Sequence, residues 1–124
     1  MALPRHPKPD DRWTLRAAWA AEHAAADAAR AAGDARAEWA RLERAHILSQ
    51  PLAGAHVRTH VAMLGYGVRH HDRREVLGQV VRTVVAAPGS LTRRYPLGNT
   101  GGADVSAVRP MPVPEDLRPL LPSR

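Results

Sequence analysis

The chain has 124 residues, a formal net charge of +6 and no cysteine. This length favours one domain with a modest core, and the lack of cysteine excludes disulfides and thiolate metal ligands. The positive charge comes from scattered arginines, and three Trp and two Tyr supply few rings that could stack on bases, so nucleic-acid binding is disfavoured.

The first ten residues are polar and include three prolines. A segment of this kind is typical of a flexible arm, so residues 1–10 are expected to stay outside the fold. It contains no apolar stretch of signal-peptide length, and nothing in the chain approaches a membrane-spanning run. We therefore expect a cytoplasmic protein without a membrane partner.

Four helices are predicted between residues 11 and 87, which would form the helical domain. Gly33 and Asp34 separate the first two, because glycine suits the left-handed residue after a helix and aspartate caps the next one. Pro51 is placed to begin a third helix, and Asp72 with Glu75 forms a capping box for a fourth. The expected limits are about 11–32, 35–48, 52–69 and 72–87.

The order of helices and turns repeats at an offset of 38 residues, because the Gly33-Asp34 turn is echoed by His71-Asp72. Two helical hairpins are therefore expected, either as a small all-α bundle or as a short repeat-like array. Residues 88–124 hold seven of the eleven prolines together with scattered apolar side chains. We expect this irregular tail to pack over the helices, with a short turn near 115–121.

The segment ERAHILSQPLAGAHVRTH, residues 43–60, brings polar side chains to two adjacent predicted helices. Glu43 and His46 are three residues apart, and His56 and His60 are four apart, so each pair shares one face of its helix. Helices joined by a short turn usually run antiparallel, which would bring the two pairs together. Glu43, His46, His56 and His60 are therefore candidate metal ligands.

Imidazole and carboxylate ligands suit zinc, iron(II), cobalt and nickel, and copper(II) would also bind tightly. The predicted function is therefore the handling of a divalent transition metal. A coordination position open to water would allow metal-assisted chemistry, with Glu22 or His23 as the nearest candidate base. Without such a position, sequestration or sensing is favoured, so the sequence does not decide whether the protein is an enzyme.

A second interpretation belongs to a different functional class. The three histidines and Glu43 also fit a structural network that satisfies polar groups in a helical core. The two hairpins would then be an interaction module that binds a protein partner or a second copy of the chain as a homodimer. Replacing His56 and His60 with alanine distinguishes the two, because only the metal interpretation predicts loss of bound metal from a folded protein.

The segments LERAHILSQPLAGAHVRTHVAML and APGSLTRRYPLGNTGGADVSAVRPMPVPEDL resemble a family of short bacterial helical proteins catalogued only as a domain of unknown function. The resemblance covers about residues 35–118. Its most specific parts are the RAHILSQP turn, the paired histidines and the GNTG segment at residues 98–101. The resemblance implies no established activity, but it does imply a link to heavy-metal-resistance genes.

Overall fold

The computed structural model describes residues 9–92, 95–106 and 109–122, and these contain four α-helices, one short 3₁₀-helix and no β-strand. The elements are α1 (Pro9–Ala31), α2 (Ala35–Ser49), α3 (Ala53–Arg69), α4 (Arg73–Leu91) and the 3₁₀-helix η1 (Arg118–Leu120). The prediction of an all-α fold with four helices is confirmed. Residues 1–8 of the predicted arm lie outside the described residues, and the division into arm, helical domain and tail stays a prediction.

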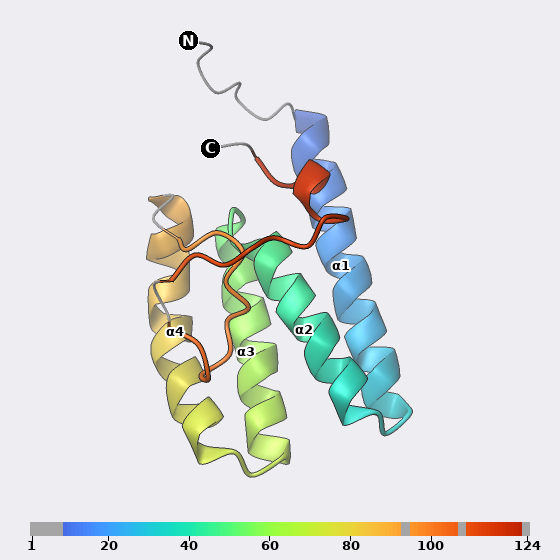
Figure 1. Cartoon of the computed structure of the whole chain (residues 1–124), viewed down its shortest axis with the longest axis vertical. Helices are drawn as coiled ribbons and strands as arrows, with labels where there is room; N and C mark the ends of the chain where they lie inside the picture. Colours follow the sequence, from blue (N-terminus) through green and yellow to red (C-terminus); the bar gives the residue numbers. More distant parts are fainter. Residues whose placement is uncertain (1–8, 93–94, 107–108, 123–124) are drawn as a thin grey trace.

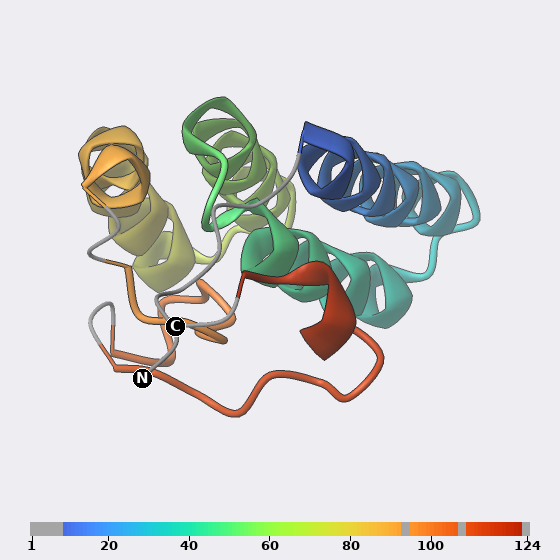
Figure 2. The same cartoon turned by 90° about the horizontal axis from the view of Figure 1, so that it is seen from above.

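The four helices form two antiparallel hairpins that lie side by side (Figure 1). Helix α1 packs against α2, α3 packs against α4, and α2 joins the two hairpins by packing against α3. Seen from above, α4, α3 and α1 follow one another along one side, while α2 and the C-terminal segment lie on the other (Figure 2). The C-terminal segment lies against α2 and α4, where the backbone oxygens of Asn99 and Gly101 bond His46 and Gln79.

An aspartate caps the second helix of each predicted hairpin, as expected. Gly33 has a φ of +74°, and the side chain of Asp34 accepts a hydrogen bond from the backbone amide three residues on, at 3.0 Å. Asp72 caps α4 in the same way, accepting from the amide of Glu75 at 3.0 Å. The predicted capping box is only half formed, because the amide of Asp72 donates to the carbonyl of Gly67 instead of to Glu75. The carboxylate of Glu75 accepts from the side chain of Gln79 and from the amide of Ala103, which ties α4 to the C-terminal segment.

The helix limits lie within one or two residues of those that the sequence predicts, except at the end of α4. Helix α1 begins at Pro9, so Pro9 and Asp10 belong to this helix and not to the predicted arm. Helix α4 continues four residues beyond Ala87 and includes Pro88. Proline removes one backbone donor, but Pro88 lies on the exposed side of the helix, where solvent can bond the freed carbonyl. The additional turn brings Ser90 into the core. Helix α3 begins at Ala53, because Pro51 lies in the turn before the N-cap rather than in the first helical turn.

The apolar core has two parts, one toward each end of the hairpin pair. The larger part joins α1, α2, the start of α3 and the C-terminal segment through Leu15, Trp19, Ala45, Ile47, Leu48, Leu52, Ala55 and Leu117. The smaller part lies where α1, α2 and α3 meet and contains Ala26, Leu42 and Met63. Trp19 also donates a hydrogen bond from Nε1 to the hydroxyl of Thr59 at 2.9 Å, which ties α1 to α3.

The C-terminal segment packs along the helices, as predicted. Leu117 is buried in the larger part of the core, and η1 contacts α1. Tyr95 is also buried, and Asp116 forms an ion pair with Arg44 of α2. Across the described residues, no helix combines the length and the apolar character that crossing a bilayer requires.

Candidate metal centre

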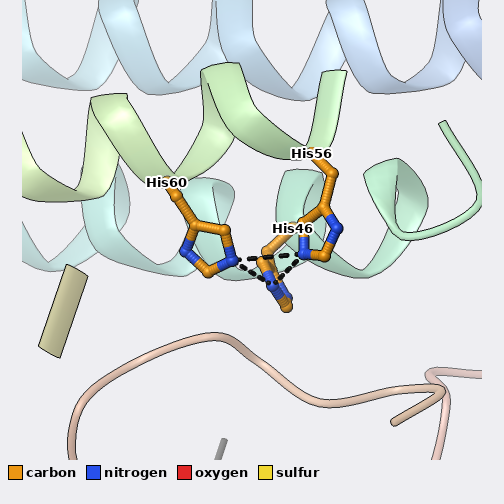
Figure 3. A group of neighbouring side chains, drawn as sticks. All are labelled: His46, His56 and His60. Atoms are coloured by element: carbon orange, nitrogen blue, oxygen red, sulfur yellow. Dashed lines mark hydrogen bonds between the residues drawn. The ribbon is translucent and has the colours of Figure 1, made fainter. Parts of the chain in front are cut away.

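Three buried imidazoles meet where α2 and α3 face the C-terminal segment (Figure 3). His46 lies in the last turn of α2, and His56 and His60 lie one turn apart on α3. Each Nε2 atom is 3.1 Å from the Nε2 atoms of the other two rings. Among the residues that the structure describes, these three side chains form a group that could hold a metal ion.

On the opposite edge of two of these rings, Nδ1 bonds an oxygen that can only accept. His46 Nδ1 lies 2.6 Å from the backbone oxygen of Asn99. His60 Nδ1 lies 2.6 Å from Oε1 of Gln79. The amide nitrogen of Gln79 donates to a carboxylate and to a carbonyl oxygen, which leaves its own oxygen facing His60. Both imidazoles must therefore carry their proton on Nδ1.

The third ring has the same arrangement through a hydroxyl group. His56 Nδ1 lies 2.8 Å from Oγ of Ser90. Ser90 donates its one hydroxyl proton to the backbone oxygen of Gln50, at 2.6 Å. The hydroxyl oxygen is then left to accept from His56, so this imidazole also carries its proton on Nδ1.

This proton arrangement leaves three lone pairs facing one another. A neutral imidazole has one N–H group, and in each of these rings that group is on Nδ1. The three Nε2 contacts drawn in Figure 3 have the length of hydrogen bonds, but none of them has a donor. The centre of the cluster is therefore a set of three convergent nitrogen acceptors.

Burial keeps the cluster uncharged at neutral pH. It lowers the pKa of His46 well below the usual value of 6.5, and the other two imidazoles add to this effect. Burial also lowers the pKa of His56 to about 3 and that of His60 to about 4. All three rings are consequently neutral near pH 7, which is the form that coordinates metals.

Charged side chains lie further out around the cluster. The guanidinium of Arg82 lowers the pKa of two of the imidazoles, although burial has the larger effect on both. Glu43 is half-buried, and burial and the nearby carboxylate of Asp104 raise its pKa, opposed by a hydrogen bond with the side chain of Thr100. Glu43 is not in the group of three histidines, and its role as a ligand stays a prediction.

The two candidate bases on α1 have other partners. Glu22 forms ion pairs with Arg41 at 3.2 Å and with Arg44 at 2.9 Å. Nε2 of His23 lies 3.2 Å from the hydroxyl of Thr59. Neither side chain belongs to the histidine group, so these contacts give no support to a base contributed by α1.

The GNTG segment forms a tight turn against His46. Gly98 and Gly101 have φ values of +80° and +86°, which favour glycine. A Cβ atom at Gly101 would lie only 2.6 Å from Cδ2 of His46. The side chain of Asn99 holds the turn by accepting from the amide of Gly101 and donating to two carbonyls further along the chain. The motif thus positions the acceptor for His46.

The residues that bond the outer edges of the rings were not singled out from the sequence. Gln79 and Ser90 are polar, uncharged and eleven residues apart, which puts them on one face of α4 three turns apart. Glu75 and Thr83 lie on the same face, so a row of polar residues at helical spacing was a usable signal for inward-facing polar contacts. The acceptor for His46 is a backbone oxygen, which no side-chain pattern can reveal.

A family model described as a protein of unknown function (DUF3703) matches residues 13–121. The chain belongs to this family. The predicted resemblance to a family catalogued only as a domain of unknown function is thereby confirmed, and the match spans all three histidines. That the RAHILSQP and GNTG segments are specific to the family stays a prediction. The family description assigns no function, so the link to metal-resistance genes stays a prediction. No curated protein and no solved structure matches the chain.

Proposed function

We propose that this protein binds a divalent transition metal ion through Nε2 of His46, His56 and His60. The observation that carries the proposal is the convergence of three buried lone pairs, 3.1 Å apart, with no donor among them. Such a centre is unfavourable when empty, because each nitrogen has lost its water and gained no partner. A cation at the point of convergence supplies a partner to all three.

A purely structural role for the histidines has weaker support. A hydrogen-bonded network needs at least one Nε2–H donor, and that proton must come from an Nδ1 that now bonds an oxygen. At His46 and His60 this transfer would leave Nδ1 without a proton. Its lone pair would then face the lone pair of an oxygen only 2.6 Å away. Protonating one imidazole to its cationic form would also supply a donor, but burial lowers the pKa of every ring and disfavours this form.

The spacing of the nitrogens suits first-row metals. Zinc–imidazole bonds are about 2.0–2.1 Å, and an ion at that distance from three nitrogens 3.1 Å apart would lie about 1 Å from their plane. The angles at the metal would be about 100°, between the octahedral and tetrahedral values. Either geometry leaves at least one further coordination position. Zinc, cobalt, nickel, iron(II) and copper(II) all accept a ligand set of this kind.

Three neutral ligands leave the charge of the ion uncompensated, and nearby carboxylates offset it. The carboxylate of Asp104 lies close enough to Glu43 to help raise the pKa of Glu43, and a cation next to them relieves that repulsion. We assign Glu43 to this compensating role. The three rings are 2 to 5% exposed, so the site favours holding an ion over turning over a substrate. Metal handling in the cytoplasm is the function we propose.

The proposal is tested by titrating chelator-treated protein with zinc or cobalt(II) in competition with a chromophoric chelator. We expect one ion per chain. His60→Ala removes a ligand, so its metal affinity should fall by more than roughly 100-fold, the upper end of the loss caused by removing a hydrogen-bond partner of a metal-bound histidine. His23→Ala is the matched control, because His23 lies outside the cluster and bonds Thr59. Equal affinities for the two variants would rule out the cluster as the binding site.

A further inference from the structure

The outer face of α4 is apolar and exposed along its whole length. Leu77, Val84 and Leu91 are 70, 73 and 75% exposed, and the same side of the helix carries Val80, Val81 and Val85, which are also exposed. Between Glu75 and the end of the helix, the only charged residue is Arg82, and its guanidinium turns inward to bond a backbone oxygen. Helix α4 lies at the edge of the molecule (Figure 2), and the exposure of these side chains means that the other helices do not cover this side.

The apolar residues on this exposed face have the same spacing when the helix is read in either direction. Leu77 and Leu91 stand seven residues before and after Val84, so the three side chains lie on one line along the helix. In an antiparallel pair of α4 helices centred on Val84, Leu77 of one copy meets Leu91 of the other. A single patch thus serves both partners, which is the requirement of a two-fold interface.

The available area is sufficient for a specific dimer. From their exposed fractions, the six apolar side chains offer on the order of 600 Å² per copy, or about 1,200 Å² for two copies, the lower limit of standard interfaces. An apolar patch of this size is at the upper end of what monomeric proteins expose, and patches at this end are often interaction sites. We propose that the chain forms a two-fold homodimer through antiparallel packing of α4, independently of metal binding.

The oligomeric state of the full chain, measured by sedimentation velocity over the micromolar concentration range, tests this proposal. We expect a mass of two chains for the parent and of one chain for Val84→Glu, with unchanged helix content because Val84 is exposed. Ala24→Glu makes the same charge change on an exposed position of α1 and should leave the dimer intact. A monomeric parent, or a Val84→Glu variant that stays dimeric, overturns the proposal.

The chain contains no cysteine, so single introduced cysteines report the register directly. With a short bis-maleimide, Val84→Cys should link to itself, because the two copies of this residue face each other at the two-fold axis. A mixture of Leu77→Cys and Leu91→Cys should give the mixed product in excess over either self-linked product. Predominant self-linking of Leu77→Cys would indicate parallel helices and contradict the proposed arrangement. This readout does not depend on whether Val84→Glu folds.

Discussion

Nε2 of His46 lies 3.1 Å from Nε2 of His60, and neither nitrogen has a proton to share. This relationship predicts the tautomers of the metal-free protein. Long-range ¹⁵N–¹H correlation spectra at neutral pH should show all three cluster imidazoles as neutral rings protonated on Nδ1. Addition of zinc should shift the Nε2 resonances and leave the Nδ1 protons in place. A ring protonated on Nε2 in the metal-free protein would contradict the account.

Replacing Gln79 with methionine should weaken metal binding without removing a ligand. The substitution removes the oxygen that accepts from His60 Nδ1 and orients the ring. We expect an affinity about 10- to 100-fold lower, as for other outer partners of metal-bound histidines. Leaving the buried N–H unpaired should also lower the free energy of unfolding by about 1–3 kcal/mol. Affinity is measured by chelator competition and stability by urea titration.

Gln50→Met is the matched control for this prediction. Gln50 is also fully buried, and its side chain bonds Pro96 and Gly98 of the C-terminal segment rather than an imidazole. Its replacement should lower stability by a similar amount and change metal affinity much less. Equal losses of affinity in both variants would mean that Gln79 acts through general stability and not through His60.

Two glycine-to-alanine substitutions should have opposite effects on stability. At Gly101 the backbone has a φ of +86° and a Cβ would approach His46 to 2.6 Å, so Gly101→Ala should cost about 1–3 kcal/mol and also weaken metal binding. At Gly65, within α3, a Cβ meets nothing within 4 Å, so Gly65→Ala should stabilise the protein by about 0.5–1 kcal/mol. Thermal unfolding of both variants checks the signs, and a Gly101→Ala protein as stable as the parent would contradict the close packing at His46.

The stability of the metal-free protein should fall as the pH is lowered from about 6.5. Unfolded histidine has a pKa near 6.5, whereas burial lowers the pKa of His56 to about 3 and that of His60 to about 4. Between these values the unfolded chain binds more protons, so stability is retained above pH 6.5 and is lost as the pH falls toward 4. Each ring contributes a slope of up to about 1.4 kcal/mol per pH unit.

Urea titrations with a chelator present, at a series of pH values, measure this slope. His60→Ala should show a shallower dependence on pH than the parent, because one buried ring no longer takes up a proton on unfolding. His70→Ala, at an exposed position, should follow the parent. Parent and His60→Ala profiles with the same slope between pH 6.5 and 4 would show that His60 is not buried as a neutral ring.

The helical order and the faces that carry the histidines were predictable because they depend on local rules. Glycine and aspartate at positions 33 and 34 act within one turn of the chain, and the spacing of His56 and His60 fixes their shared face on any helix. The turn after His46 is short, so the meeting of α2 and α3 also followed from the sequence. Three of the four candidate ligands therefore meet as the spacing indicated.

The rest of the site depends on contacts between distant residues. The sequence placed the end of α4 at Ala87, because proline usually ends a helix, yet Ser90 reaches His56 only because the helix continues through Pro88. The outer partners lie between 19 and 53 residues from the imidazoles they bond. Periodicity carries no information at that separation. Glu43 shares the predicted face with His46, but the C-terminal segment supplies Thr100 as its partner.

Metal content is the most direct test of the central claim. The protein should be purified without a histidine tag and analysed for transition metals beside a His56→Ala/His60→Ala double variant. We predict close to one ion per chain in the parent and almost none in the variant, with helix content retained in both. A parent that is purified without metal and binds none of zinc, cobalt, nickel, copper(II) or anaerobic iron(II) on titration would contradict the account.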